Sequence, residues 1–515
     1  MLAKVLSFGL NGIEGYPVLV ETDVYNGLPA YELVGLGDTA IKESKERVRS
    51  AIKNSGFEYP AKRITINLAP ADLKKEGPLY DLAIALGLLA ASEQVLPDFL
   101  KYMVVFGELS LNGDVRPVNG ILPMVIEARR RGFNLMVVPR ENAREASYIQ
   151  DVKILPVGNL SEIAAILNKT QPPEFFPPSL WQAPDETGDV DIDFKDIKGQ
   201  EKAKRAMEIA AAGMHNILLI GSPGSGKSML AKALPGILPD LTFEEALEVT
   251  KIHSIAGELN DLSGGIVKKR PFRGPHHMSS AAAIVGGGSK NHPGEISLAH
   301  CGVLYFDELP EFRRDILEAL RQPLEDGKIT VSRANSKVTY PADVMFAASM
   351  NPCPCGNFGS EDVECRCSPT QISRYLSKIS GPLLDRIDLH VEMSRVKYDE
   401  LRSMQRQESS AQVRERVNEA RMRQQERYKS IGKHCNAQLN SSEIKEYCRI
   451  GAQAHDLLRM AFEKMKLSAR SYTRILLVAR TIADLDHSND VEAAHVAEAV
   501  QYRSLDKKYW GFAYD

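Results

Sequence analysis

Hydrophobic positions along the chain repeat with two different periods, and the period changes several times. In the first 170 residues, short runs alternate between apolar and polar side chains, which is typical of half-buried strands. Between these runs, apolar side chains return every three or four residues, which indicates amphipathic helices. The strands expected here cover 5–8, 16–21, 63–68, 103–106 and 135–138, and the helices cover 41–53, 82–91 and 121–131. This alternation predicts an α/β domain over residues 1–170.

A second α/β pattern follows a stretch that shows neither period. Residues 171–193 are rich in proline and acidic side chains, so we interpret them as a linker. Residues 194–396 again alternate strands with helices, and residues 397–515 show only the helical spacing. The chain is therefore predicted to contain two α/β domains and a C-terminal helical domain. Apolar side chains in the linker predict that part of it packs on a neighbouring surface: Phe175, Phe176, Leu180 and Trp181.

Composition places the protein among globular chains with several domains. Of its 515 residues, 43% are hydrophobic and 25% are charged, which is enough apolar material for substantial cores. The formal net charge of −3 excludes an overall basic character, so any nucleic-acid surface must be a local patch. No apolar run is long enough to predict a membrane span, and the first residues do not resemble a secretory signal. Seven cysteines, four of them between 353 and 367, favour a reducing cytoplasm.

The strongest chemical signal is a phosphate-binding loop between an expected strand at 216–220 and an expected helix from 229. The loop matches the pattern G-x-x-x-x-G-K-[ST] with Gly221, Ser222, Pro223, Gly224, Ser225, Gly226, Lys227 and Ser228. Glycines let backbone N–H groups point inward around phosphates, and the N-terminus of a helix attracts an anion. We therefore expect ATP at this loop, with Lys227 on its β- and γ-phosphates and Ser228 holding Mg²⁺.

Two further strands end in the polar residues that such a hydrolase needs. The apolar run 302–306 is followed by Asp307, which can hold Mg²⁺ through water, and by Glu308, which can polarise the attacking water. The next expected strand, 343–349, ends close to Asn351, which we interpret as the sensor that orients the hydrolytic water. These residues complete a predicted ATP-hydrolysing site.

The 79 positions from Ser228 to Asp307 exceed what one crossover helix and one strand require, so an insertion is expected. A second insertion, after Glu308, contains two alternating runs around a polar turn, which predicts a β-hairpin over 329–340. Both insertions carry cations that we interpret as candidate DNA-binding residues: Lys268, Lys269, Arg270 and Arg273 in the first, and Lys328, Arg333 and Lys337 in the second. Ordinary exposed cations on a turn are the alternative.

Four cysteines form two C-x-C pairs in one loop after the sensor. They are Cys353, Cys355, Cys365 and Cys367, with nine residues between the pairs. Four thiolates can close a tetrahedral structural zinc site, although the usual spacing within a pair is two to four residues. The sequence therefore predicts zinc, with four reduced thiols as the alternative.

Segments of the first domain resemble the proteolytic domain of Lon-type proteases. The resemblance is carried by Lys75-Glu76-Gly77-Pro78 and by residues 107–115 and 117–120. It implies a Lon-protease-like (S5-like) α/β fold. Where those enzymes have a catalytic serine and lysine, this chain has Leu79 and Leu122, neither of which can act as a nucleophile or a base. The fold is therefore expected without the protease chemistry.

The second α/β domain resembles AAA+ ATPases, and its insertions resemble those of the magnesium chelatase and MCM helicase branch. Residues 194–200 resemble the adenine-side entry, and residues 380–388 resemble the arginine-finger motif of that branch. The resemblance implies that Arg386 reaches the γ-phosphate held by a neighbouring subunit, where a planar guanidinium suits spread phosphoryl charge. It also implies a second-sensor arginine at Arg470, with Arg474 one helical turn later as the alternative, in a helical lid.

Taken over its whole length, the chain is identified as a member of the ComM/YifB family. This resemblance implies a cytoplasmic homo-hexameric AAA+ motor that uses ATP and Mg²⁺, binds single-stranded and branched DNA, and drives branch migration as a helicase or translocase. It further implies a role in natural transformation and recombination, with recombination proteins as partners and no membrane association. A chelatase- or chaperone-type motor that remodels a protein partner stays open as the alternative. An ATP-dependent protease is disfavoured by Leu79 and Leu122.

Overall fold

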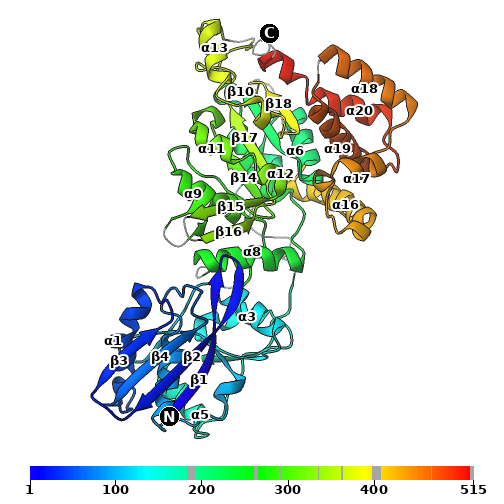
Figure 1. Ribbon diagram of the computed structural model, residues 1–515. Coiled ribbons are helices and arrows are strands. Elements are labelled where there is room, and N and C mark those ends of the chain that lie inside the picture. The colour runs from blue at the N-terminus through cyan, green and yellow to red at the C-terminus, as the bar shows by residue number, and fades with distance from the viewer. Residues whose placement is uncertain are drawn as a thin grey trace. The chain divides into compact units, whose positions relative to one another are not determined.

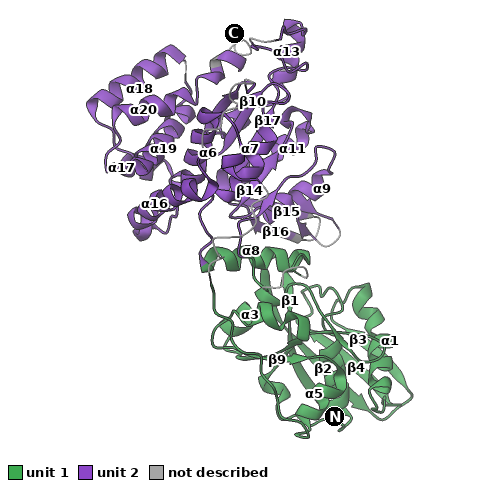
Figure 2. Cartoon of the chain, turned by 180° about the vertical axis from the view of Figure 1, so that it is seen from behind, with its two compact units in different colours: residues 1–182, 243–267 green, residues 183–242, 268–515 purple. Residues whose placement is uncertain are grey.

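The computed structural model divides into two compact units, which are described separately (Figures 1 and 2). Unit 1 comprises residues 1–182 and 243–267, and unit 2 comprises residues 183–242 and 268–515. The residues described are 1–182, 192–259, 265–288, 291–333, 336–360, 363–396, 407–465 and 467–510. Most of the predicted linker's second half, 183–191, therefore lies outside the described residues, and the predicted domain boundaries stay predictions.

Unit 1 is built on a seven-stranded mixed sheet with the order β3-β4-β2-β1-β5-β8-β9. The long strands β1 and β2 pair antiparallel, whereas β5, β8 and β9 continue the sheet from β1 in parallel. The strands of this unit are β1 (Leu2–Asn11), β2 (Glu14–Tyr25), β3 (Ala30–Val34), β4 (Arg63–Ala69), β5 (Val104–Val105), β8 (Leu135–Pro139) and β9 (Lys153–Val157), with a short separate pair of β6 (Glu108–Leu109) and β7 (Val115–Arg116).

Two helices of unit 1, α1 and α5, begin at side-chain caps. Asp38 accepts a hydrogen bond from the Ile41 backbone N–H at the start of α1, and Asn159 does the same for Glu162 at the start of α5. Helix α2 is buried along its whole length against β1 and β2. The helices are α1 (Thr39–Asn54), α2 (Asp81–Ala91), α3 (Ile121–Arg130), α4 (Ala143–Ala146), α5 (Leu160–Leu167) and α8 (Phe243–Ala256).

Helix α8 belongs to unit 1 although it follows the phosphate loop in sequence (Figure 2). It packs on α3, and the backbone N–H of Gly120 donates a hydrogen bond to the carbonyl of Ser254 at 3.0 Å. The Ser254 hydroxyl donates to the buried carboxylate of Glu145 at 2.9 Å. Part of the predicted linker packs here, because the rings of Trp181 and Phe243 lie 6.0 Å apart, whereas Phe175 and Leu180 are exposed.

The positions where a Lon-type protease carries its serine and lysine are part of the core of unit 1. Leu79 and Leu122 are both buried within the same hydrophobic cluster. A hydrophobic pair of this kind stabilises the domain by its burial and offers no acid–base chemistry.

Unit 2 contains a five-stranded parallel sheet with the order β11-β14-β17-β10-β18. The crossover places β17 between β10 and β14. Because the three strands are parallel, their carboxyl ends meet at one edge of the sheet. The predicted strands are found as β10 (Ile217–Gly221), β14 (Val303–Phe306) and β17 (Met345–Met350), flanked by β11 (Phe272–Arg273) and β18 (Leu389–Met393). All residues of β10, β14 and β17 are buried, as expected for parallel strands covered on both faces.

Unit 2 also contains two hairpins, of which β15–β16 is labelled in Figure 1, and a set of helices. The predicted hairpin is confirmed as β15 (Lys328–Arg333) and β16 (Ser336–Pro341), with its tip at 334–335 outside the described residues, and a smaller one pairs β12 (Gly286–Gly287) with β13 (His292–Pro293). The helices are α6 (Glu201–Gly213), α7 (Lys227–Ala233), α9 (Ala281–Val285), α10 (Glu295–Leu298), α11 (Arg314–Ala319), α12 (Pro323–Asp326), α13 (Pro369–Leu376) and α14 (Gly381–Leu384).

The C-terminal part of unit 2 is helical, as the three- and four-residue spacing predicts. Its helices are α16 (Ser410–Tyr428), α17 (Ser441–Tyr447), α18 (Ala452–Met465), α19 (Ala469–Leu485) and α20 (Ala493–Gln501). Helices α16 and α19 pack on α6 and share one hydrophobic core with the sheet. Across the described residues, every helix is too short or too polar to cross a membrane.

Candidate active site

The phosphate-binding loop lies where β10 passes into α7, in the strand–loop–helix context that the sequence predicts. Gly224 and Gly226 have φ of +77° and +89°, a left-handed conformation that favours glycine. The backbone N–H of Ser225 donates to the carbonyl of Ser222 at 3.2 Å, which closes the turn. Gln200, from the predicted adenine-side entry, donates its side-chain amide to the carbonyl of Ser225 at 3.2 Å.

The ammonium of Lys227 is held inside the loop by three oxygens. Its Nζ donates to the carbonyls of Gly221 at 2.7 Å and Ser222 at 3.0 Å, and to Oδ1 of Asn351 at 3.1 Å. Burial lowers the pKa of Lys227, against the opposing charges of Asp307 and Glu308. The predicted sensor therefore touches the predicted phosphate-binding lysine, and a bound phosphate would offer this ammonium an anionic partner in place of neutral carbonyls.

Asp307 follows β14 and reaches across to the loop. Its Oδ2 accepts a hydrogen bond from the hydroxyl of Ser228 at 2.9 Å, and its Oδ1 accepts one from the hydroxyl of Ser349. Burial opposes ionisation, but the Ser349 and Ser228 hydrogen bonds hold the pKa of Asp307 below its ordinary value. Ser349 was not singled out from the sequence. The parallel register, which sets Phe306 opposite Ala348, is what brings it beside Asp307.

Glu308 stands next to Asp307 with an exposed side chain and a φ of +54°. Its backbone N–H donates to Oδ1 of Asp307 at 3.1 Å. A non-glycine residue in the left-handed region is uncommon and is enriched at functional sites. The exposed side chain of Glu308 therefore follows directly after the carboxylate that bonds to Ser228.

The side chains gathered at this loop fit Mg²⁺ and a nucleoside triphosphate. Ser228 and Asp307 supply hard oxygen donors whose atoms lie 2.9 Å apart, which is the ligand type that Mg²⁺ prefers. Lys227 and the N-terminus of α7 face the same loop. The residues predicted for nucleotide and metal binding are thus gathered at one edge of the sheet, and their roles stay predictions.

The two predicted phosphate-contacting arginines share one carboxylate. Arg386 is buried, and its Nη2 donates to Oε2 of Glu325 while its Nη1 donates to the carbonyl of Pro382 at 2.6 Å. The more exposed Arg470 donates its Nη2 to Oε1 of Glu325 at 2.7 Å. Burial opposes ionisation of Glu325, but Arg386 and then Arg470 hold its pKa below the ordinary value.

Arg474, the alternative second sensor, is engaged in the interior. Its Nε lies 3.3 Å from Oδ1 of Asp388, a carboxylate that is only 2% exposed. The backbone N–H of Asn216 donates to Oδ2 of the same carboxylate at 3.0 Å. Burial raises the cost of ionising Asp388, yet Arg474 and the His215 ring hold its pKa below the ordinary value. Between the two candidates, Arg470 is the one left near the surface.

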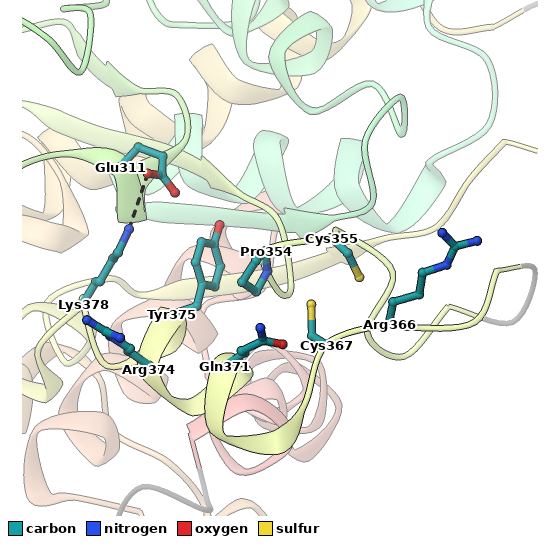
Figure 3. Close-up of a pocket in the computed structure, with 9 residues that line it drawn as sticks. All are labelled: Glu311, Pro354, Cys355, Arg366, Cys367, Gln371, Arg374, Tyr375 and Lys378. Atoms are coloured by element: carbon teal, nitrogen blue, oxygen red, sulfur yellow. Dashed lines mark hydrogen bonds and ion pairs between the residues drawn. The ribbon is translucent and has the colours of Figure 1, made fainter.

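The four cysteines of the two C-x-C pairs converge. The sulfur of Cys353 lies 3.4 Å from that of Cys355 and 3.7 Å from that of Cys365, and all four sulfurs, including that of Cys367, lie within 4.8 Å of one another. Figure 3 shows Cys355 and Cys367 pointing toward each other at the edge of a cavity of about 550 Å³. The imperfect sequence spacing therefore does not prevent a tetrahedral arrangement of thiols.

Backbone amides favour the thiolate form of Cys355, whereas burial and the neighbouring thiols raise the pKa of Cys367, and they outweigh a backbone hydrogen bond at Cys365 to raise its pKa as well. Hydrogen bonds from the backbone of Arg366 and then Asn357 lower the pKa of Cys355 to about 6. Amide donors to sulfur are the surroundings that stabilise a metal-bound thiolate. The donor set, four soft ligands with an open cavity beside them, fits Zn²⁺.

The hairpin of β15 and β16 has one apolar and one polar face. Ile329, Val331, Val338 and Tyr340 are buried, whereas Lys328 and Lys337 are exposed. The register sets Lys337 opposite Ser332. The side chain of Arg333, the third predicted cation here, lies outside the described part of the structure.

The cations of the first insertion divide into two groups. Arg270 donates to the carbonyls of Pro239 and Cys301, each at 2.6 Å, and Arg273 forms two hydrogen bonds with Glu295 at 2.6 and 2.9 Å. Lys268 is half-buried and Lys269 is exposed. The structure thus holds both arginines within unit 2 and leaves Lys269 at its surface.

Three family models match the chain, and together they cover most of it. They are "Magnesium chelatase, subunit ChlI" at 193–401, "Subunit ChlI of Mg-chelatase" at 20–142, and "Magnesium chelatase, subunit ChlI C-terminal" at 407–503. The magnesium chelatase-like AAA+ fold and the helical C-terminal region expected from the sequence are therefore confirmed.

Two similar proteins span almost the same length. The competence protein ComM of Haemophilus influenzae is 45% identical over 507 residues, which is 98% of each chain. The uncharacterized protein YifB of Escherichia coli is 45% identical over 502 residues, or 96% of each chain. Lon protease 2 of Bacillus subtilis is 28% identical over 123 residues, which is 24% of this chain and 22% of that protein. The Lon-like character of the N-terminal region is thus supported as well.

Proposed function

The chain belongs to the ComM/YifB family of magnesium chelatase-like AAA+ proteins, and from this premise we propose that it is an ATP-hydrolysing motor that acts on DNA. In this proposal it works as a homo-hexamer, binds single-stranded and branched DNA, and drives branch migration while incoming DNA is integrated during natural transformation. Recombination proteins are its expected partners.

The hydrogen bond between Ser228 and Asp307 is the main support for the ATPase part of the proposal. Lys227 would exchange its carbonyl partners for the β- and γ-phosphate oxygens, and Asn351 would orient the attacking water. Glu308 would accept a proton from that water as its oxygen bonds to the γ-phosphorus and the bond to the β-phosphate oxygen breaks. When bound by Ser228 and Asp307, Mg²⁺ would neutralise charge on the departing phosphate.

In the proposal, two arginines contact a nucleotide that is shared between subunits. Arg386 and Arg470 lie together at Glu325, whereas Lys227 and Asp307 lie at the phosphate loop. In the proposal, the pair contacts the γ-phosphate bound by the next subunit and stabilises charge there during hydrolysis.

The DNA part of the proposal is supported by the name of the Haemophilus relative, a competence protein, and by the hairpin lysines. Lys328 and Lys337 are exposed on the polar face of a hairpin whose other face is anchored in the core. Repeated around a ring, such a pair makes a local positive track in a chain of net charge −3, and phosphates bind to tracks of this kind.

A protein-remodelling motor is the second candidate. It is favoured by the internal pairing of Arg270 and Arg273, which removes two of the predicted DNA contacts, and by the match to a chelatase subunit model. DNA would then leave ATP hydrolysis unchanged.

The deciding experiment compares ATP hydrolysis by the full chain without DNA, with single-stranded DNA and with a four-way junction, at several salt concentrations. The DNA motor predicts stimulation and binding that weakens steeply with salt. Electron microscopy of the same samples tests for rings. An unstimulated ATPase without salt-sensitive binding would favour the remodelling motor, and a chain that stays monomeric with ATP and DNA contradicts the shared site.

We further propose that the four-cysteine cluster holds a structural zinc ion. Cys353 follows the sensor Asn351 by two residues, and a Cβ on Gly356, within the same loop, would lie 2.4 Å from Pro223 of the phosphate loop. A closed cluster would thus fix the loop that joins the sensor to the nucleotide site.

A further inference from the structure

Glu325 joins three elements of unit 2 that are far apart in the sequence. It lies on α12, and its Oε2 accepts a hydrogen bond from Nη2 of Arg386, which follows α14. Its Oε1 accepts a hydrogen bond at 2.7 Å from Nη2 of Arg470, in the first turn of α19. Glu325 was not among the candidate residues that the sequence provided, because no motif includes it.

The shared carboxylate fixes where both guanidinium groups lie. Arg386 has both terminal nitrogens engaged, one on Glu325 and one on the carbonyl of Pro382 at 2.6 Å. Arg470 is 43% exposed in its side chain, so Glu325 is what restrains its charged end. Two guanidinium groups repel each other, and an anion between them removes that repulsion.

We propose that Glu325 is a positioning residue for ATP hydrolysis, which holds Arg386 and Arg470 at a fixed spacing so that both meet the same γ-phosphate. The proposal rests on the proposed function, in which these two arginines contact nucleotide. Charge-stabilising groups that are oriented beforehand lose little free energy to reorganisation during the reaction. Glu325 thus acts through the arginines and contributes to kcat, while the phosphate loop sets the affinity for ATP.

The test compares Glu325→Gln, which keeps the size of the side chain and removes its charge, with the wild type. We expect kcat to fall about tenfold or more, because misplacing a phosphate-contacting group is costly. The KM for ATP and the oligomer formed with an ATP analogue should stay unchanged. Glu32→Gln is the matched control, since Glu32 accepts a hydrogen bond from Arg63 at 2.6 Å with a similarly exposed side chain in unit 1.

A double-mutant cycle separates positioning from a general structural effect. In an Arg470→Ala background, Glu325→Gln should lower kcat less than it does in the wild type, because one of its two targets is already gone. An unchanged kcat in Glu325→Gln, or an equal loss in both backgrounds, overturns the proposal. If Arg386→Ala and Arg470→Ala both keep the wild-type rate of ATP hydrolysis, the result contradicts the proposed function, in which these arginines contact nucleotide.

Discussion

The side-chain hydroxyl of Ser228 lies 2.9 Å from Oδ2 of Asp307, although 79 positions separate the two residues in sequence. The contact joins the end of the phosphate loop to the end of β14, and it brings together two oxygen donors of the type that Mg²⁺ prefers. Ser349 holds the other oxygen of the carboxylate, so Asp307 is oriented before any ligand arrives.

Lys227 and Glu308 should affect different steps of the ATPase reaction. Lys227→Ala should abolish ATP binding, because the ammonium is the only side-chain cation that the described structure places inside the loop. Glu308→Gln should bind ATP normally and hydrolyse it about 100-fold or more slowly, since the amide cannot accept a proton. Fluorescent-nucleotide binding and steady-state hydrolysis measure the two effects. Normal turnover by Glu308→Gln would remove Glu308 from the mechanism.

Arg474→Ala should destabilise unit 2 by about 3 kcal/mol, because it leaves the buried carboxylate of Asp388 without its guanidinium partner. Arg470→Ala removes an exposed ion pair and should cost about 1 kcal/mol or less. Urea unfolding of both variants checks the difference. In folded protein, ATP hydrolysis should fall more in Arg470→Ala than in Arg474→Ala. A stable Arg474→Ala variant with defective turnover would instead favour Arg474 as the sensor.

Replacing Lys328 and Lys337 together by alanine should weaken binding of single-stranded DNA and flatten its dependence on salt concentration. Each phosphate contact that is lost lowers the slope of log K against log salt by about 0.7 for a single strand. ATP hydrolysis without DNA should not change, since the lysines lie on the exposed face of the hairpin. The paired control is Lys445→Ala with Lys464→Ala, two exposed lysines on α17 and α18. Equal salt slopes for both double variants would contradict the hairpin as a DNA contact.

Elemental analysis of protein purified without chelators should find about one zinc per chain. Cys355→Ser with Cys367→Ser should lose the metal and lower the unfolding temperature, because two of the four converging thiols are gone. Cys448→Ala is the control, since this cysteine is buried elsewhere in unit 2. A metal-free wild type with full stability would show that the thiols pack without an ion.

Stability of unit 1 should fall as pH rises from about 4.5 to about 7. Burial raises the pKa of Glu145 to about 7, so in this window the folded chain keeps a proton that the unfolded chain releases. The full effect corresponds to about 3 kcal/mol. Asp81 shifts in the same direction, with a pKa raised by burial to about 6. The measurement is therefore the difference between wild type and Glu145→Gln.

In that comparison, the stability of Glu145→Gln relative to the wild type should increase from pH 5 to pH 8. Thermal unfolding of the full chain measures it. The amide has no proton to lose, and its oxygen can still accept a hydrogen bond from Ser254. A difference between the two proteins that does not vary with pH would show that Glu145 is ionised in the folded chain throughout.

The sequence alone determined the parts of this protein that depend on short contiguous stretches. The phosphate loop, the strand that ends in Asp307 and the C-terminal helices were predicted correctly in type and near their bounds. Local backbone preferences and hydrophobic periods depend on a few neighbouring residues, so they can be predicted without knowledge of the fold.

Only the tertiary structure decided which residues work together. Arg470 and Arg474 are one helical turn apart, and the rotation of α19 against the core is what sends Arg474 to Asp388 and leaves Arg470 to Glu325. Strand register brings Ser349 to Asp307, and packing on α3 places α8 in unit 1. These pairings arise from contacts across long sequence separations, which no local period encodes, because each depends on how complete elements are oriented when their apolar faces are buried together.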